Sequence, residues 1–203
     1  MKIYSYVIEH DYGHAPNPYF GVCTLARCKF RKKGHPRNLV EKACIGDWVV
    51  GTGGADRRKS AGNGNIIFAM KVEDKLPLSR YWNDPKFKKK KPLMDGEYAQ
   101  RRGDNKKPKS VFEENERFVL ISWSEYYYFG KEAAAEAVEI PQEFHKIEKK
   151  GPGYKANFCP EFITEFLHWL KSKHKPGKHG EPWGKEFKSS REQREREACK
   201  PSC

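Results

Sequence analysis

Short runs of β-branched and aromatic residues, separated by glycine and proline, dominate the hydrophobic pattern of the first 130 residues. The run 2–9 (KIYSYVIE) predicts a central strand. The run 65–73 (NIIFAMKVE) predicts another, because Ile66, Phe68 and Met70 share one parity and therefore one face. The same signal predicts strands or strand ends over 20–30, 45–52, 118–122 and 126–130.

The clearest helical period lies late in the chain. Phe162, Phe166 and Leu170 follow one another at i, i+4 and i+8, which predicts a helix over 161–173. Pro160 suits the first turn of this helix, and the Pro-Gly pair at 176–177 ends it. A short helix is also expected within 78–87.

Short strands, Gly/Pro loops and one late helix together predict an α+β fold. The expected core is a small bent sheet or a small β-barrel, followed by a C-terminal helix. The strand–helix alternation of dinucleotide folds is missing, and so are the GxGxxG and GxxxxGK[ST] motifs. We expect one domain over 1–174 and a basic, largely flexible tail over 175–203, with Trp183 and Phe187 as candidate anchors.

The charge balance indicates the class of partner. The chain has 40 Lys and Arg against 27 Asp and Glu, a formal net charge of +13, and the excess is spread along the chain. Such a surface attracts polyanions, so nucleic acid or a nucleotide is the predicted partner. The alternative is a surface that only confers solubility.

Cysteine spacing and hydropathy bear on metal binding and on the cellular compartment. The six cysteines include no CxxC pair, so no metal and no cofactor are predicted. The chain opens on a strand-like run instead of a signal peptide, and no apolar run reaches membrane-spanning length. We therefore expect a cytoplasmic protein with reduced thiols and no membrane partner.

The first candidate site covers the strand 2–9 and the loop 10–18 (HDYGHAPNP), where rings alternate with hydrogen-bonding side chains. Flat heterocycles are bound by such combinations, since rings stack and amides or carboxylates read edges. The alternative is two same-face sheet tyrosines and a long connection. The residues of this candidate site are Tyr4, Tyr6, His10, Asp11, Tyr12, His14, Asn17 and Phe20.

Three further segments could contribute. The stretch 46–54, which contains Trp48, has glycine amides for a phosphate with Arg57 and Arg58 nearby, or is simply a tight hairpin. The cluster Lys88, Lys89, Lys90 and Lys91 could contact phosphates, and Asp104 and Asn105 a base, or both could be solvated loops. The aromatic residues at 123–129 are interpreted mainly as core.

Several segments, in order, resemble a known family. They are YSYVIEHDYGHAPNPYFGVCTLARCK (4–29), IGDWVVGTGG (45–54), IIFAMKV (66–72), RYWNDPKF (80–87), RGDN (102–105), FVLIS…YYYFG (118–130) and GPGYKANF (151–158). Over about 3–170 the chain resembles the second of the nucleotide modification associated domain families of bacteria and phages. The resemblance implies a role beside DNA base hypermodification. GDW before a strand is also similar to the PUA, ASCH and EVE barrels, which implies a PUA-like β-barrel as the alternative to the bent sheet.

The leading hypothesis is therefore binding of a nucleotide or modified base in nucleic acid, within a DNA modification or phage-related system. The alternatives are an enzyme acting on a nucleotide base, with His10 or Asp11 as acid or base, and a subunit that binds other proteins of such a system. Proline on both sides of Asn17 suggests a fixed amide for a base edge. The substitution Asn17→Ala would then abolish binding with little loss of stability, unless the amide caps its own loop.

Overall fold

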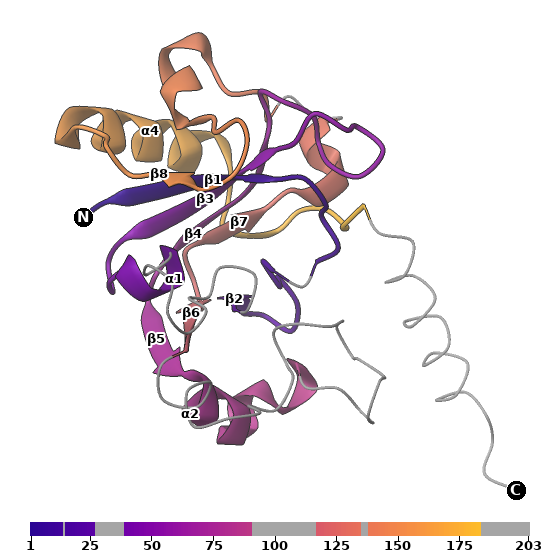
Figure 1. The fold of residues 1–203 in the computed structure, drawn as a ribbon, viewed down its shortest axis with the longest axis vertical. Helices are drawn as coiled ribbons and strands as arrows, with labels where there is room; N and C mark the ends of the chain where they lie inside the picture. Colours follow the sequence, from indigo (N-terminus) through magenta and orange to yellow (C-terminus); the bar gives the residue numbers. More distant parts are fainter. Residues whose placement is uncertain (14, 27–38, 91–116, 135–137, 184–203) are drawn as a thin grey trace, which may run out of the picture.

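The computed structural model describes residues 1–13, 15–26, 39–90, 117–134 and 138–183 (Figure 1). Its larger sheet has the strand order β8-β1-β3-β4-β7-β9. These strands are β8 (Tyr154–Lys155), β1 (Ile3–Ile8), β3 (Trp48–Gly53), β4 (Ile66–Lys71), β7 (Tyr126–Tyr128) and β9 (Gly177–Lys178). The pairs β1–β3 and β7–β9 are parallel, and the others are antiparallel.

The smaller, three-stranded sheet continues the larger one around a bend. It contains β2 (Cys23–Leu25), β6 (Phe118–Ser122) and β5 (Asp74–Pro77), in the order β2-β6-β5. The chain passes from β4 into β5 within two residues, and from β6 into β7 within three. The antiparallel pair β4–β7 of the larger sheet therefore continues directly into the pair β5–β6 of the smaller sheet. The bend lies at the two connections that join these pairs.

The carboxylate of Glu73 holds this bend. It accepts hydrogen bonds from the Ser122 hydroxyl and from the main-chain N–H groups of Trp123, Ser124 and Glu125. Partial burial alone would raise the pKa of Glu73, but these hydrogen bonds outweigh it and lower the pKa to about 2. The turn between β6 and β7 is thus fixed by an ionised side chain from the connection between β4 and β5.

Helices cover both ends of this bent sheet (Figure 1). Helix α4 (Pro160–Lys173) buries Ile163, Phe166, Leu167 and Leu170 in the main core. The short elements α1 (Leu39–Lys42), η2 (Gly130–Ala134) and η3 (Gln142–Ile147) also border this core. Helix α2 (Leu78–Asn83) and η1 (Pro85–Lys90) pack on the smaller sheet, where Tyr81, Phe87 and Ile121 form a second cluster.

The predicted fold class is confirmed. The fold is α+β with a bent sheet and a C-terminal helix, and no closed barrel forms among the described residues. The helix predicted at 161–173 begins one residue earlier, because Pro160 occupies its first turn. Within the described segments, no helix has both the length and the apolar character needed to cross a membrane.

The segment 177–183 packs against the domain. Strand β9 pairs with β7, and Trp183 N–H donates to the Asp11 carbonyl at 3.0 Å. Pro182 lies so close to Gly13 that a Cβ there would come within 2.6 Å of it. The sequence-based boundary at 174 therefore does not coincide with the last residues that pack, while 184–203 lie outside the described residues.

These contacts predict different effects for two truncations. Removing 176–203 should lower the free energy of unfolding by about 3 kcal/mol or more, because several main-chain hydrogen bonds of roughly 1 kcal/mol each are lost with the Pro182 contact. Removing only 184–203 should leave the melting temperature within a few degrees of the full chain. Equal melting temperatures for both truncations would show that 177–183 is dispensable.

Candidate functional site

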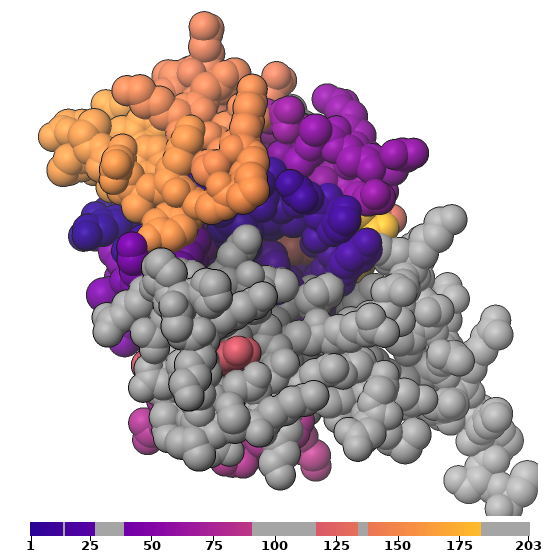
Figure 2. All heavy atoms as spheres, viewed as in Figure 1, coloured from indigo at the N-terminus to yellow at the C-terminus, as the bar shows by residue number. Residues whose placement is uncertain are grey.

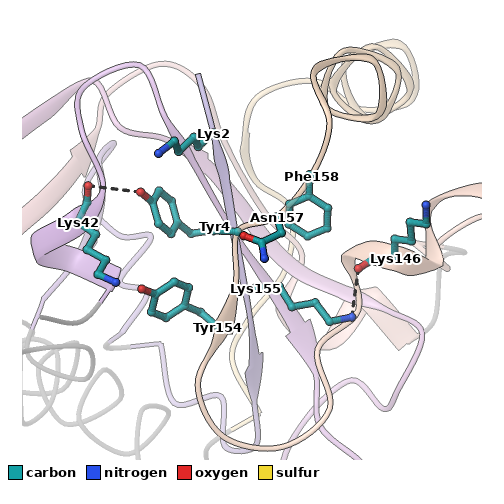
Figure 3. Close-up of a pocket in the computed structure, with 9 residues that line it drawn as sticks. Lys2, Tyr4, Lys42, Lys146, Tyr154, Lys155, Asn157 and Phe158 are labelled. Atoms are coloured by element: carbon teal, nitrogen blue, oxygen red, sulfur yellow. Dashed lines mark hydrogen bonds between the residues drawn. The ribbon is translucent and has the colours of Figure 1, made fainter. Parts of the chain in front are cut away.

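A pocket lies where β1 pairs with the edge strand β8. Its volume is about 660 Å³, and Figure 3 shows its lining side chains converging from four separate parts of the chain. In the space-filling view, the orange surface that contains β8 and α4 abuts the indigo N-terminal segment (Figure 2). The lining residues are Lys2, Tyr4, Lys42, Lys146, Tyr154, Lys155, Ala156, Asn157 and Phe158.

Aromatic rings form the floor and one side of this pocket. The rings of Tyr4 and Tyr154 are 5.7 Å apart and tilted by 57°. Phe158 stacks on Phe162 of α4 at 5.3 Å, which fixes the ring at the opposite side. Asn157 points its amide between Tyr4 and Phe158 (Figure 3). The pocket thus offers apolar faces together with one amide that can donate and accept hydrogen bonds.

Four of the described lining residues are lysines, and none of the described lining residues is acidic. The Lys42 ammonium lies 5.6 Å from the centre of the Tyr154 ring, within cation–π range. Lys155 Nζ donates to the carbonyls of Lys146 and Glu148, at 3.3 and 2.6 Å. Among the described residues, the ammonium groups of Lys2 and Lys146 have no hydrogen-bond or ion-pair partner. They are therefore available to an anion.

The local sequence explains why these groups meet. Gly151 and Gly153 have φ of 73° and 88°, a left-handed backbone that glycine adopts at little cost, so the chain can turn from η3 into β8. Tyr154 then pairs with Tyr6, and Lys155 with Ser5. Pro160 starts α4 directly after the lining residues. The segment 151–158 (GPGYKANF) is thus held between a turn and a helix start.

Tyr4 is neutral at physiological pH. Burial raises its pKa above the ordinary value of 10, with a further contribution from the nearby Asp47 carboxylate. Its hydroxyl donates to the Lys42 carbonyl at 3.4 Å. Asp47 itself accepts from the main-chain N–H groups of Lys2 and Cys44, at 2.8 and 3.0 Å. This carboxylate therefore connects the main chain at Lys2, a lining residue, to the main chain at Cys44, which follows α1.

A second, smaller cavity lies on the same edge. Its volume is about 310 Å³, and it includes Tyr6 and His10, two of the residues predicted to contact a ligand. Tyr6 is buried against Phe68, whereas His10 is exposed and lies 5.8 Å from the Tyr12 ring. The complete lining is Tyr6, Val7, Ile8, Glu9, His10, Ala15, Pro152 and Gly153.

Asp11 is placed in the interior of the domain. It is 1% exposed, and both of its carboxylate oxygens accept the Tyr128 hydroxyl at 2.8 Å. Burial raises the pKa of Asp11 to about 6, although the hydrogen bonds from Tyr128 and Gly13 oppose this effect. Asp11 lines neither of the two cavities described above.

Asn17 and Lys90 form a buried pair on the side of the smaller sheet. Their exposed fractions are 0% and 1%. Lys90 Nζ donates to Asn17 Oδ1 at 2.9 Å and to the Asn17 carbonyl at 3.1 Å. Asn17 Oδ1 also accepts from Tyr19 N–H at 3.4 Å. The amide thus caps its own loop and binds a lysine that was predicted to contact phosphate.

The remaining predicted residues are dispersed. Trp48 is buried and stacks on Tyr127 in the core. Phe20 is half exposed at φ 61°, before β2. The amides of Gly53 and Gly54 already donate to Asn65 and Ile8. Arg57, Arg58, Lys88 and Lys89 are exposed, and Arg58 pairs with Asp56 at 3.0 Å. His14, Lys91, Asp104 and Asn105 lie outside the described residues.

The sequence reasoning selected Tyr4 but not the other members of the larger pocket. Lys146, Tyr154, Lys155, Asn157 and Phe158 all lie between 146 and 158. A usable signal was present, because GPGYKANF combines a Gly-Pro-Gly turn with a ring, a cation and an amide. Nothing in the sequence pairs this segment with the first strand.

No group of three or more His, Cys, Asp or Glu side chains suited to a metal ion occurs among the described residues. Comparison with known proteins gives one family. The model of nucleotide modification associated domain 2 matches residues 1–111 and 106–191, which include every lining residue of both cavities. No curated protein and no solved structure matches the chain.

Proposed function

The chain belongs to the nucleotide modification associated domain 2 family, and from this premise we propose that the larger pocket between β1, β8 and α1 binds a nucleotide. The family name implies involvement in nucleotide modification systems. Binding of a nucleotide, free or within nucleic acid, is the specific function that the pocket supports within such a system.

One observation carries this proposal: four lysines and three aromatic rings line one pocket, with no acidic side chain among its described lining residues. A nucleotide combines an anionic phosphate with a flat base. Lys2 and Lys146 offer ammonium groups to the phosphate, and the Tyr4–Tyr154 pair offers ring faces to the base. Asn157 adds an amide of the kind that reads a base edge.

We propose that the pocket binds the nucleotide without its lining side chains acting as a catalytic acid or base. Its described lining residues include no carboxylate and no imidazole, the groups that most often transfer protons near neutral pH. Binding is therefore expected to depend on charge and stacking.

The substitution Tyr154→Ala should weaken binding of 5′-mononucleotides by roughly 5- to 150-fold, because base–aromatic stacking contributes about 1–3 kcal/mol. Calorimetric titration with dAMP, dCMP, dGMP and dTMP measures this effect. Lys173→Ala, at an exposed position on α4, is a matched control that should leave the affinity within about twofold.

Salt dependence tests the charged part of the site. Lys146→Ala should weaken nucleic-acid binding and reduce the slope of log Kd against log salt by about 1, as expected for one lost phosphate contact. Lys173→Ala should keep the slope of the unmodified chain.

Mononucleotide affinities that are identical in the unmodified chain and in Tyr154→Ala would reject this pocket as the site.

A further inference from the structure

The smaller cavity is the direct neighbour of the larger pocket on the β1–β8 edge. Tyr4 lines the larger pocket, and Tyr6, two residues further along β1, lines the smaller cavity. Along the antiparallel segment, Tyr154 of β8 lines the larger pocket, and Gly153, directly before β8, lines the smaller cavity. Tyr6 and Tyr154 are register partners. One residue of this cross-strand pair therefore faces each cavity.

The two cavities differ in chemistry. In contrast to the lysine-lined pocket, the described lining of the smaller cavity contains no lysine or arginine. Instead it has the carboxylate of Glu9 and the imidazole of His10, both on exposed residues, beside the apolar surfaces of Ala15 and Pro152. A phosphate is disfavoured next to Glu9. An uncharged base fits, because a carboxylate accepts from an exocyclic amino group such as N4 of cytosine.

Tyr4 and Tyr6, which line the two cavities, lie two residues apart on β1. Residues two apart on a strand lie about 6.6 Å apart and point to the same face, which applies to Tyr4 and Tyr6. Stacked nucleotides rise by only about 3.4 Å per step. A ligand that places one base in each cavity must therefore be unstacked, which is how proteins read single strands.

Positive charge lies beyond the smaller cavity as well. The loop 54–60, which carries Arg57 and Arg58, is hydrogen-bonded to the end of β1. Gly54 N–H and the Ser60 hydroxyl both donate to the Ile8 carbonyl, at 3.0 and 2.5 Å. Lys2 thus lies at the start of β1 and this loop at its end, where Arg58 is paired with Asp56 and Arg57 is exposed. Cationic residues at both ends of the strand suit a continuous phosphodiester backbone.

We propose that the two cavities are consecutive subsites for a single-stranded segment, so that the ligand is a nucleotide within a strand whose neighbouring base enters the Glu9–His10 cavity. This inference rests on the proposed function, because it takes the lysine-lined pocket as the first subsite. It adds the class of ligand, an unstacked strand of at least two nucleotides, and a preference for an amino-bearing base in the second subsite.

Binding of ligands of increasing length tests this inference. The probes are dCMP, d(pCpC), d(pTpT) and a 12-base-pair duplex, titrated at one low salt concentration. The dinucleotide d(pCpC) should bind at least tenfold more tightly than dCMP and several-fold more tightly than d(pTpT). The duplex should bind more weakly per site than a single strand of equal length.

A double substitution, Glu9→Gln with His10→Ala, should remove most of the gain from dCMP to d(pCpC) and the preference over d(pTpT), with dCMP binding changed less than twofold. Glu165→Gln on α4 is the control, at an exposed position that lines neither cavity. The inference is overturned if d(pCpC) binds no tighter than dCMP, if the double substitution weakens dCMP equally, or if the duplex binds best. Each of those results with dCMP still bound leaves the proposed function standing, whereas failure of dCMP and d(pCpC) alike removes both.

Discussion

Asn17→Ala is expected to lower the free energy of unfolding by about 2–3 kcal/mol, since a hydrogen bond to a buried charged group contributes about 1.5–3 kcal/mol. Asn17 Oδ1 is one of the oxygens that solvate the Lys90 ammonium inside the domain, and it also caps the loop at Tyr19. Chemical denaturation at neutral pH measures the loss. The effect should reach the smaller sheet first, because Lys90 Nζ also contacts Thr24 of β2, at 3.4 Å.

The matched substitution is Asn17→Asp. It keeps the oxygen that faces Lys90 and replaces Nδ2, a buried atom that has no hydrogen-bond partner among the described residues, by a second acceptor. Its stability should stay within about 1 kcal/mol of the unmodified chain, since it converts a hydrogen bond into an ion pair of similar geometry. If Asn17→Ala instead keeps full stability and loses nucleotide binding, the sequence-based hypothesis of a base-reading amide is correct.

Asp11→Asn is expected to stabilise the protein at neutral pH and to flatten its stability between about pH 4 and pH 7. The pKa of Asp11 rises from the ordinary 3.8 to about 6 on folding, so the folded state binds more protons than the unfolded state in that range. The stability from this group is therefore complete below about pH 4 and is lost as the pH rises through about 6. The difference amounts to about 3 kcal/mol.

Urea denaturation at several pH values checks this expectation. Measurements above pH 5 exclude the contribution of Glu73 to the pH dependence of stability. The lowered pKa of Glu73, about 2, makes stability rise with pH, opposite to the effect of Asp11. The stability from Glu73 is present above its ordinary pKa of 4.5 and is lost only as the pH falls toward 2. Asparagine retains an acceptor for the Tyr128 hydroxyl, so the loop should stay folded. If the free energies of unfolding of the unmodified chain and of Asp11→Asn change in parallel with pH above pH 5, Asp11 is not the titrating group.

The fold class could be predicted from the sequence because it is encoded locally. The i, i+4, i+8 series from Phe162 reflects which side of α4 is buried. The apolar run within 65–73 marks a strand that is buried on both faces. The bend was expected only in outline. Its agent, Glu73, lies beside strand β5 and carries no local mark of its contacts with Ser122 and Ser124.

The candidate site could be predicted only in part, because its two halves come from opposite ends of the domain. Tyr4 and His10 were selected from a segment in which rings and polar groups alternate. Only one of the four lysines that give the larger pocket its charge, Lys2, lies beside β1, and the other three come from α1, η3 and β8. Their meeting depends on the pairing of β8 with β1, and such long-range pairing leaves no periodicity in either segment.

The sequence by itself determined the family, the α+β class, the late helix and the basic character of the surface, because composition, motifs and short-range periodicity are properties of the chain. Only the tertiary structure decided which polar groups are buried. It turned Asn17 toward Lys90, 73 residues away, and enclosed Asp11 beneath Tyr128, while it left Lys2 and Lys146 at an open pocket. The physical reason is that the environment of an ionisable group depends on which distant segments pack around it, and burial sets both its charge and its availability to a ligand.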